Sequence, residues 1–297
     1  MTSQRIGWIG TGVMGASMCG HLLTAGHRLT VFSRTRDKAR TLLEKGAAWV
    51  DTPKAVAQNS DIVFTMVGFP EDVREVILGD AGVMAGTKTG DTVVDMTTSS
   101  PDLARTIHRE CATRGVNALD APVSGGDVGA REATLAIMVG GDQPVFDAMK
   151  PLFDIMGKTI SLMGGPGSGQ HTKMTNQILI AGTMIGVVES LLYAQRAGMD
   201  AHHVIDVIGQ GAASSWCINT LGRRIADGDF DPGFYIKHFV KDMGIALDEA
   251  RHMRLSLPGL ALVHQFYVAS IAMGWEDLGT QGLFQVLAAM NRKSSSR

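Results

Sequence analysis

The sequence predicts an α/β domain with a doubly wound parallel sheet, followed by an all-α domain, with a long central helix joining the two. Three observations lead to this prediction. Short β-branched runs alternate with longer amphipathic stretches over the first half of the 297 residues, a pattern typical of parallel sheets. Of the 36 glycines, 23 fall within the first 169 residues. After that point, apolar residues recur at three- and four-residue steps, as in helices.

The elements follow from these patterns in chain order. Strands are expected at seven short apolar runs: residues 5–9, 29–32, 62–66, 92–95, 117–120, 135–139 and 159–163. The central helix is expected at about 169–197, and because it is apolar on most sides we expect it to be buried. Later helices are expected around 204–208, 236–250, 260–272 and 283–290. The expected domain bounds are 1–165 for the sheet domain, 166–196 for the interdomain helix and 197–297 for the helical domain.

Charge and cysteine content restrict the function classes. The 27 basic and 29 acidic residues give a net charge of −2, which provides no basic footprint for nucleic acid or an anionic membrane. We therefore expect a small-molecule ligand and neither of those partners. The three cysteines (Cys19, Cys111 and Cys217) are far apart and form no C-x-x-C pair, which favours a reducing cytoplasm. A strand beginning at residue 5 leaves no room for a secretory signal.

A glycine motif follows the first expected strand. Gly10-Thr11-Gly12-Val13-Met14-Gly15 is a G-x-G-x-x-G between a strand and a helix. In this setting the first glycine permits a tight turn, the second lets the backbone approach a pyrophosphate, and the third allows close helix packing. The helix amino terminus adds N–H donors and a positive dipole. We therefore expect a Rossmann-type dinucleotide-binding domain; the alternative is a turn that is merely rich in glycine.

The end of the second expected strand bears on the choice of dinucleotide. An acidic residue there holds the ribose 2′-hydroxyl of NAD, whereas an arginine accommodates the 2′-phosphate of NADP. This sequence reads Ser33-Arg34-Thr35-Arg36, without a carboxylate. We expect NADP, with NAD as the second choice. The alternative for Arg34 is a solvated surface charge.

Lys173 is the candidate acid and base. It is the last charged residue before Glu189, and Asn176 follows one helical turn later on the same face. A lysine at a helix start is most often a solvated cation. Burial beside apolar surface and near other cations, however, lowers the pKa of an ammonium towards neutrality, which suits proton transfer. Asn176 is expected to orient either a substrate hydroxyl or the lysine itself.

Two further segments are expected at the same cleft. Residues 120–126, Asp-Ala-Pro-Val-Ser-Gly-Gly, follow a strand at the carboxyl edge of the sheet, and they offer a hydroxyl and N–H groups suited to a carboxylate. Lys241 and Asp242 lie in an amphipathic helix, for which an exposed ion-paired face is the alternative. No ligand cluster accompanies the pair His202 and His203, so no metal is expected.

Together these motifs resemble the β-hydroxyacid dehydrogenase family, which includes 3-hydroxyisobutyrate dehydrogenase, tartronate semialdehyde reductase and the glyoxylate and succinic semialdehyde reductases. Four motifs occur in the family's order across most of the chain: Gly10–Gly15, Asp120–Gly126, Gly167–Asn176 and Lys241-Asp242. The resemblance implies an NAD(P)-dependent oxidoreductase. Such an enzyme interconverts a short β-hydroxy acid and its semialdehyde or keto acid by hydride transfer.

The resemblance also implies roles for single residues. Lys173 would be the catalytic acid and base, Ser124 and Gly125 would hold the substrate carboxylate, and Asn176 would lie near the reacting oxygen. Around the nicotinamide and the substrate pocket it implies Met66, Val67, Thr98, Lys241 and Phe234. One departure is Gly68, which stands where the family often has proline. A homodimer or homotetramer is also implied.

Three other functions are alternatives. An imine reductase of the same superfamily would be expected to carry aspartate or tyrosine in place of Lys173, and 6-phosphogluconate dehydrogenases are longer. A rival of another class is a catalytically silent NADP-binding protein. The motifs are equally compatible with glyoxylate and with methylmalonate, tartronate and succinate semialdehydes as substrates.

Overall fold

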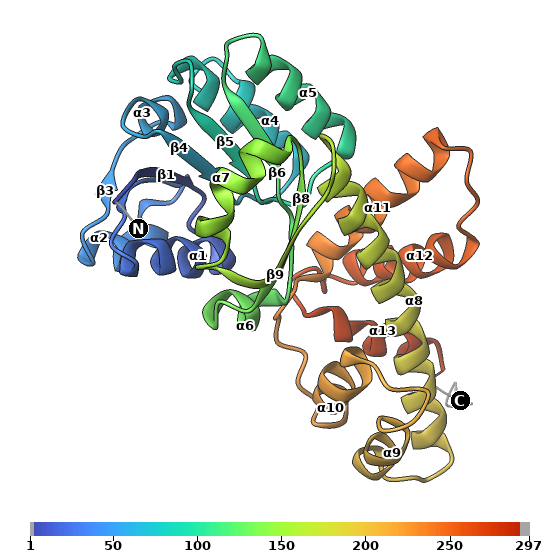
Figure 1. Ribbon diagram of the computed structural model, residues 1–297. Helices are drawn as coiled ribbons and strands as arrows, with labels where there is room; N and C mark the ends of the chain where they lie inside the picture. Colours follow the sequence, from blue (N-terminus) through green and yellow to red (C-terminus); the bar gives the residue numbers. More distant parts are fainter. Residues whose placement is uncertain (1–2, 292–297) are drawn as a thin grey trace. The chain divides into compact units, whose positions relative to one another are not determined.

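The computed structural model describes residues 3–291, and the chain divides into two compact units, Met1–Lys173 and Met174–Arg297. The boundary falls inside helix α8 (Ser168–Arg196; Figure 1). Residues 168–173 of this helix are in the first unit, and the remainder is in the second. The last residues of the expected helical domain, 292–297, lie outside the described residues. The expected domain bounds stay a prediction.

The first unit is built on one sheet with strand order β3-β2-β1-β4-β5-β6-β8-β7, and β9 pairs with β8. Neighbouring strands from β3 to β6 are all parallel, so their carboxyl ends meet at one edge. The strands are β1 (Arg5–Ile9), β2 (Arg28–Phe32), β3 (Ala48–Trp49), β4 (Ile62–Thr65), β5 (Thr92–Asp95), β6 (Asn117–Asp120), β7 (Val123–Ser124), β8 (Leu135–Gly140) and β9 (Gly157–Gly164).

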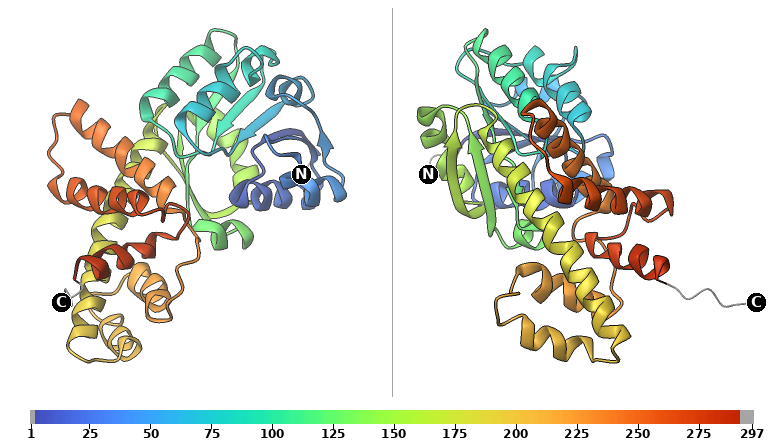
Figure 2. Two further views of the ribbon diagram at one scale, coloured as in Figure 1. Left: turned by 180° about the vertical axis from the view of Figure 1, so that it is seen from behind. Right: turned by 90° about the vertical axis from the view of Figure 1, so that its right-hand side faces the viewer.

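Helices cover both faces of this sheet (Figures 1 and 2). Alternate residues of one strand enter different cores: Trp8 of β1 packs in the core that includes α1 and α7, whereas Ile9 packs in the core that includes α3, α4 and α5. Strands buried on both sides must be apolar throughout, which explains the continuous apolar runs in the sequence. The helices are α1 (Val13–Thr24), α2 (Arg40–Glu44), α3 (Pro53–Gln58), α4 (Pro70–Leu78), α5 (Pro101–Ala112), α6 (Gly126–Arg131) and α7 (Gln143–Phe153), with 3-10 turns η1 (Arg36–Ala39) and η2 (Val83–Ala85).

The sheet departs from the expected pattern in one respect, because it is mixed rather than wholly parallel. Strand β8 runs antiparallel to β6 and β7. The connection from Ser124 to Leu135 holds only the short helix α6, and a parallel return needs a crossover of a dozen or more residues. The two-residue strands β3 and β7 are additional to the seven expected ones.

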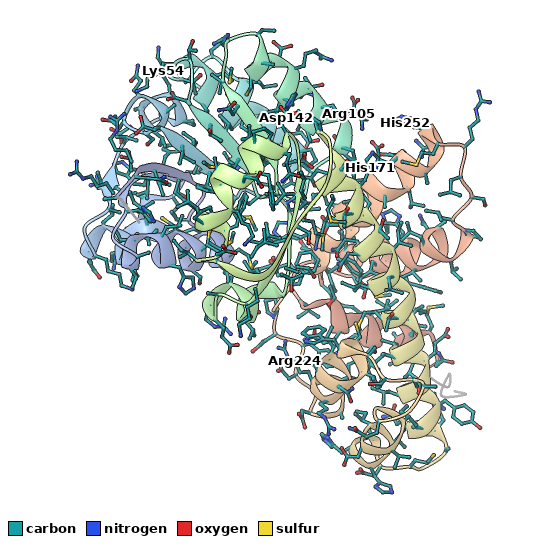
Figure 3. The ribbon with its side chains drawn as sticks, in the orientation of Figure 1. Lys54, Arg105, Asp142, His171, Arg224 and His252 are labelled. Atoms are coloured by element: carbon teal, nitrogen blue, oxygen red, sulfur yellow. The ribbon has the colours of Figure 1, made fainter. Side chains whose placement is uncertain are left out.

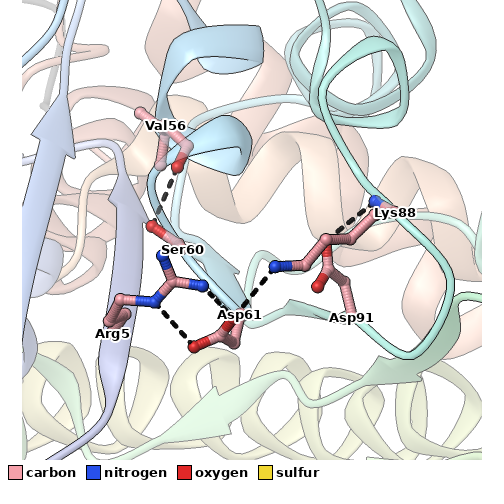
Figure 4. A network of polar contacts seen from close by, with 6 residues as sticks. All are labelled: Arg5, Val56, Ser60, Asp61, Lys88 and Asp91. Atoms are coloured by element: carbon pink, nitrogen blue, oxygen red, sulfur yellow. Dashed lines mark hydrogen bonds and ion pairs between the residues drawn. The ribbon is translucent and has the colours of Figure 1, made fainter.

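Ion pairs link neighbouring strands at the amino-terminal edge of the sheet (Figure 4). Arg5 at the start of β1 pairs with Asp61, which precedes β4, with a distance of 2.9 Å between Nε and Oδ2. Lys88 Nζ lies 3.4 Å from Asp61 Oδ1, and the Lys88 N–H donates to Asp91 just before β5. The hydrogen bond and charge of Arg5 lower the pKa of Asp61. The charged residues at this edge therefore join β1, β4 and β5 and have a structural role.

The second unit is helical. Its core includes Phe239, Met243 and Tyr267, with the rings of Phe239 and Tyr267 5.0 Å apart in an edge-on arrangement. The Tyr267 hydroxyl is buried and donates to the Thr280 carbonyl at 2.8 Å. Besides α8, the elements are α9 (Ala201–Ile208), the π-helical turn η3 (Cys217–Gly222), α10 (Arg223–Ala226), α11 (Ile236–His252), α12 (Pro258–Ala272), the 3-10 turn η4 (Thr280–Gly282) and α13 (Leu283–Met290).

Helix α8 is less buried than its composition predicts. Met184 and Val188 are buried, but Leu179 and Tyr193 are 72% and 77% exposed. Among the described residues, α8 is the one helix whose length and apolar composition would suffice to cross a membrane, with 44% of the most apolar stretch buried. Core helices of globular proteins meet the same criteria, so this property carries little weight by itself.

All three cysteines are buried thiols. Burial raises the pKa of Cys217 to about 11 and that of Cys111 to about 12, and it raises the pKa of Cys19 further still. Because the thiolate is the reactive form, these cysteines are inert packing residues at neutral pH.

Candidate active site

The glycine motif lies where the strand order of the sheet reverses. Strand β1 is flanked by β2 on one side and β4 on the other, and residues 10–12 lead from its carboxyl end into α1. In open α/β sheets, ligands bind in the crevice outside the carboxyl ends of the strands at such a switch point. The expected contact segments 33–35, 66–67 and 97–98 follow β2, β4 and β5, so they emerge at the same edge.

The three glycines of the motif have different surroundings. Gly10 has φ +95°, and a Cβ placed there would lie 2.2 Å from the Met66 carbonyl oxygen. A Cβ at Gly15 would lie 2.0 Å from the Gly10 carbonyl oxygen. At Gly12 a Cβ would meet no atom within 4 Å. Gly10 and Gly15 are therefore required for packing of the chain, while Gly12 leaves an open approach to the backbone.

This loop suits the pyrophosphate of a nicotinamide dinucleotide. Helix α1 begins at Val13 and no side chain caps its first turn, so the N–H groups there lack that kind of acceptor. The Thr11 hydroxyl is buried and has no hydrogen-bond partner among the described residues. An anion at Gly12 would accept from both the N–H groups of this turn and the Thr11 hydroxyl. Met14 packs against the core of the first unit.

Arg34 follows β2 and is held by an ion pair. Its Nη1 lies 3.0 Å from Asp72 Oδ1, and the other oxygen of Asp72 accepts from the Phe69 N–H at the start of α4 at 3.2 Å. The side chain of Arg34 is 81% exposed. Ser33 and Thr35 flank it in an irregular segment before η1. The guanidinium is thus largely exposed and lies beside the amino end of α4.

Hydrogen bonds join the loops after β4 and β5. Asp95 Oδ1 accepts from the Thr65 hydroxyl at 2.7 Å and from the Thr97 N–H at 3.1 Å. The Thr97 hydroxyl in turn accepts from the Val67 N–H at 3.0 Å. These bonds join the loop that contains Met66 and Val67 to the loop that contains Thr98. They are present even though glycine stands at position 68, where the family often has proline.

The amino terminus of α8 is anchored by a carboxylate from β6. Asp120 Oδ1 accepts from the Gly167 N–H and Oδ2 from the Gln170 N–H, both at 2.8 Å. An N-cap side chain normally accepts such bonds, but the residue before α8 is Gly167, which has none, so Asp120 performs this role from the sheet. Burial raises the pKa of Asp120, and the N–H groups of Gly167 and Gln170 offset part of that effect.

The side chain of Gln170 adds a second anchor. It is fully buried; its Oε1 accepts from the Ser99 N–H at 2.9 Å and its Nε2 donates to the Thr97 carbonyl at 2.8 Å. A Cβ at Gly169 would lie 2.4 Å from the Met138 carbonyl oxygen, so the helix approaches β8 closely. Lys173 follows one turn after Gln170 and is 6% exposed.

His171 lies in the same helical turn and contacts a neighbouring helix. Its Nε2 lies 3.3 Å from Nη1 of Arg105 on α5, and both residues are labelled in Figure 3. Ser124 ends β7, and Gly125 and Gly126 have φ +132° and +63°, so the chain turns sharply into α6 there. These residues also belong to the first unit.

The remaining candidates lie in the second unit. Asn176 Nδ2 donates to Gln177 Oε1 at 2.7 Å, and Gln177 Nε2 donates to Asp242 Oδ2 at 2.6 Å. Lys241 Nζ lies 3.1 Å from Asp242 Oδ1. Phe234 precedes α11 and contacts the ring of Phe239 edge-on at 5.9 Å. Asn176 and Lys241 are therefore connected through Asp242, which the sequence motif pairs with Lys241, and through Gln177, which the sequence did not single out.

Within residues 3–291, no group of three or more histidine, cysteine, aspartate or glutamate side chains could hold a metal ion. Three residues that sequence reasoning missed are buried and polar: Asp95, Gln170 and Gln177. A polar residue inside an apolar helix is the one signal that could have indicated the two glutamines, because such residues are buried only when hydrogen-bonded.

Comparisons with known proteins find relatives of both units. Residues 5–165 match the model described as the NAD binding domain of 6-phosphogluconate dehydrogenase, and 167–287 match that of the NAD-binding domain of NADP-dependent 3-hydroxyisobutyrate dehydrogenase. A probable mitochondrial 3-hydroxyisobutyrate dehydrogenase-like protein of Arabidopsis thaliana is 50% identical, covering 99% of this chain and 88% of its own. The 2-hydroxy-3-oxopropionate reductase of Escherichia coli is 41% identical over 97% of this chain and 98% of its own.

Among solved structures, the 3-hydroxyisobutyrate dehydrogenase of Mycobacterium tuberculosis, determined with L-serine, superimposes with a TM-score of 0.87 at 30% identity. The superposition covers 96% of this chain and 99% of that one. Both units therefore have counterparts in one continuous relative.

Asp95 gives a test of the electrostatics of this edge. Burial raises the pKa of Asp95 to about 6 from an ordinary value of 3.8. The folded protein then binds this proton more tightly than the unfolded chain, so the associated stability is present below pH 4 and is lost as the pH rises through 6. At about 1.4 kcal/mol per pKa unit, the loss is about 3 kcal/mol. Urea unfolding of Asp95→Asn from pH 4.5 to 7.5 should lack this decrease.

Asp102→Asn is the matched control, because that carboxylate is exposed and paired only with Arg105 in the same helical turn. It should keep the pH dependence of the unsubstituted protein. Parallel stability curves for the unsubstituted protein and Asp95→Asn would contradict the assignment.

Proposed function

The chain belongs to the 3-hydroxyisobutyrate dehydrogenase family of nicotinamide-dependent hydroxyacid dehydrogenases, and on this premise we propose that it reduces short carboxylate-bearing semialdehydes with NADPH, Lys173 serving as the acid. In the reverse direction Lys173 takes the proton from the hydroxy acid. The nicotinamide, when bound, supplies or takes up the hydride. The chain is an oxidoreductase acting on a CH–OH group.

The observation that carries the proposal is the placement of Lys173. It is a buried ammonium on a helix whose first turn is hydrogen-bonded to the carboxyl ends of β5 and β6, the edge at which the glycine loop also lies. Burying a cation is costly, so a lysine fixed at this edge indicates chemistry. A lysine, rather than an aspartate or tyrosine, also argues against imine reduction.

The chain's residues have separate tasks in this mechanism. Ser124 and Gly125 hold the substrate carboxylate through the hydroxyl and N–H groups at the turn into α6. Of the residues in the second unit, we assign Phe234 to the substrate, Asn176 to the reacting oxygen, and Lys241 to the nicotinamide and the substrate. Lys173 donates its proton to the oxygen on which negative charge develops, and the ammonium stabilises that charge mainly in the transition state.

Arg34 is the residue we assign to cofactor choice. Its guanidinium follows β2, where the ribose is held in this class of domain, and arginine pairs well with a phosphate. Among residues 33–35 there is no carboxylate to bind the 2′-hydroxyl of NAD. NADP is therefore proposed over NAD. A cytoplasmic location stays a prediction from the cysteine pattern.

We also propose a homodimer or homotetramer. In the second unit, large apolar side chains are exposed on α8, α12 and α13: Leu179, Tyr193, Leu262 and Met290. Where such side chains adjoin, exposed apolar surface is typical of an interface. Light scattering on the full chain should give two or four times the 31.6 kDa of one chain, whereas a monomer at micromolar concentration would contradict the proposal.

Lys173→Ala and Lys173→Arg test the catalytic role. Arginine keeps the positive charge but does not release a proton near neutral pH, so both variants should lose about 100-fold or more in kcat. The dissociation constant of NADPH, followed by its fluorescence, should change little. The assay panel is glyoxylate and methylmalonate, tartronate and succinate semialdehydes, with a cyclic imine for the rival activity.

Lys158→Ala is the control, since Lys158 is exposed on β9. A Lys173→Arg variant that keeps more than a tenth of the unsubstituted kcat would exclude Lys173 as the acid. Turnover of the imine alone would exclude the hydroxyacid dehydrogenase reaction.

Arg34→Gln tests cofactor choice. Removing the guanidinium should raise KM for NADPH about tenfold or more, because one charge-assisted hydrogen bond to the 2′-phosphate is lost. KM for NADH, which has no 2′-phosphate, should change by less than about threefold. Arg40→Gln, which removes another exposed ion-paired arginine nearby in sequence, should affect neither. A preference of the unsubstituted enzyme for NADH, or equal losses with both cofactors, would refute this role.

A further inference from the structure

One hydrogen bond joins the helix after the glycine motif to the helix after the turn assigned to the substrate carboxylate. His21 is in the last turn of α1, and its Nε2 lies 2.9 Å from the carbonyl oxygen of Ala130 on α6. A carbonyl oxygen can only accept, so the histidine Nε2 must carry the hydrogen and donate it. The two helices pack against each other within the first unit (Figures 1 and 2).

Helix α6 is weak by itself. It has six residues, Gly126–Arg131, of which two are glycines, and glycine is a poor helix former. Isolated helices this short are not stable in water. Among the described residues, no side chain caps its amino end at Gly125. The geometry of α6 therefore depends on contacts from the rest of the first unit.

The carboxyl end of α6 is the end that His21 contacts. The last four carbonyl groups of a helix have no partner within it, so other groups must supply the donors. The Thr134 N–H donates to the Gly129 carbonyl at 2.9 Å, after a left-handed residue, Ala133, with φ +54°. The next residue of the helix, Ala130, is fully buried, and His21 donates to its carbonyl. Loss of this donor would leave a buried acceptor without that partner.

The amino end of α6 carries the turn that the proposed mechanism uses. Ser124 ends β7, and the Gly125 carbonyl accepts from the Gly129 N–H at 3.0 Å. A Cβ at Gly125 or at Gly129 would lie 3.2 Å from Leu135 Cδ2, so this side of the helix lies directly on β8. Six helical residues span only about 9 Å. A tilt of α6 at its carboxyl end therefore also moves the N–H groups of Gly125 and Gly126.

We propose that His21 is a positioning residue for the turn that binds the substrate carboxylate, because it holds α6 against α1 from the far end of α6. This inference rests on the proposed function, which assigns Ser124 and Gly125 to that carboxylate. The glycine motif lies at the opposite end of α1, about 12 Å from His21 along the helix. His21 should therefore affect binding of the substrate and leave binding of the cofactor unchanged.

His21→Leu and His21→Gln form a matched pair of variants. Leucine has no donor, whereas the Nε2 of glutamine can take the place of the histidine Nε2 and donate to Ala130. With leucine, KM for the semialdehyde should rise about tenfold, the size of one lost hydrogen bond. The value of kcat should change less than about threefold, because a contact to the unreacting carboxylate contributes equally to the ground state and the transition state. With glutamine, KM should stay within about threefold of the unsubstituted value.

Thr24→Val is the control, because Thr24 is exposed on the same helix and its hydroxyl donates within α1, to the Gly20 carbonyl at 2.9 Å. This variant should leave KM, kcat and the dissociation constant of NADPH unchanged. His21→Leu should leave the dissociation constant of NADPH unchanged too. Should leucine prevent folding, His21→Ser, whose side chain is too short to reach Ala130, replaces it and should give the same rise in KM.

A readout without cofactor or substrate is hydrogen exchange of the backbone amides at the carboxyl end of α6. The N–H groups of Glu132 and Thr134 donate there to the carbonyls of Val128 and Gly129, both at 2.9 Å. Their exchange should become about tenfold faster in His21→Leu and stay unchanged in His21→Gln and Thr24→Val. Equal exchange and equal KM in His21→Leu and Thr24→Val would overturn the inference. So would a glutamine variant as impaired as the leucine variant.

The failure of the proposed function looks different. If the unsubstituted chain turned over none of the carboxylate-bearing semialdehydes, the proposed reaction would be wrong, and the exchange of Glu132 and Thr134 would still decide whether His21 holds α6. Normal turnover, with faster exchange but an unchanged KM in His21→Leu, would refute the inference alone, because the hydrogen bond would then be purely structural. An equal rise in KM and in the dissociation constant of NADPH would refute it as well.

Discussion

The attachment of α8 to the sheet is the constraint on which the candidate site depends. The Asp120 carboxylate accepts from the first N–H groups of the helix, and the Gln170 side chain is hydrogen-bonded on both sides to the segment after β5. Each bond is buried, so breaking one would leave a polar group without solvent to replace its partner. The first turn of the helix that carries Lys173 is consequently fixed against the carboxyl edge of the sheet. A side chain at Gly169 would clash with the Met138 carbonyl oxygen, so the helix can approach the sheet this closely only with glycine there.

The two edges of the sheet have different tasks. At the amino edge, Arg5 and Lys88 both pair with the Asp61 carboxylate, and these contacts are structural. At the carboxyl edge, the polar groups include backbone N–H groups, a buried hydroxyl at Thr11, and carboxylates that accept from N–H donors. A parallel sheet creates this asymmetry, because the strand ends that receive helix amino termini all lie on one side.

Much of this arrangement can be predicted from the sequence, and the parts that cannot have physical reasons. The seven expected strands lie within two residues of their observed bounds, because strands buried on both faces give unbroken apolar runs. Strands β3 and β7 have two residues each, which is too short to give a sequence pattern. Strand β8 is antiparallel because the connection before it is too short for a parallel return, and the apolar pattern of a strand does not reveal its direction. Gln170 and Gln177 are visible in the sequence, but their partners Thr97, Ser99 and Asp242 lie far along the chain, and only the folded backbone brings them within reach.

The cysteines described with the fold have a practical consequence. Cys19, Cys111 and Cys217 are all buried with raised pKa values, so none offers an exposed thiolate to alkylating reagents near neutral pH. A cysteine introduced on the surface would thus be the fast-reacting thiol in the native protein. The natural chain can serve directly as a background for placing a single spectroscopic probe, without first removing its own sulfhydryl groups.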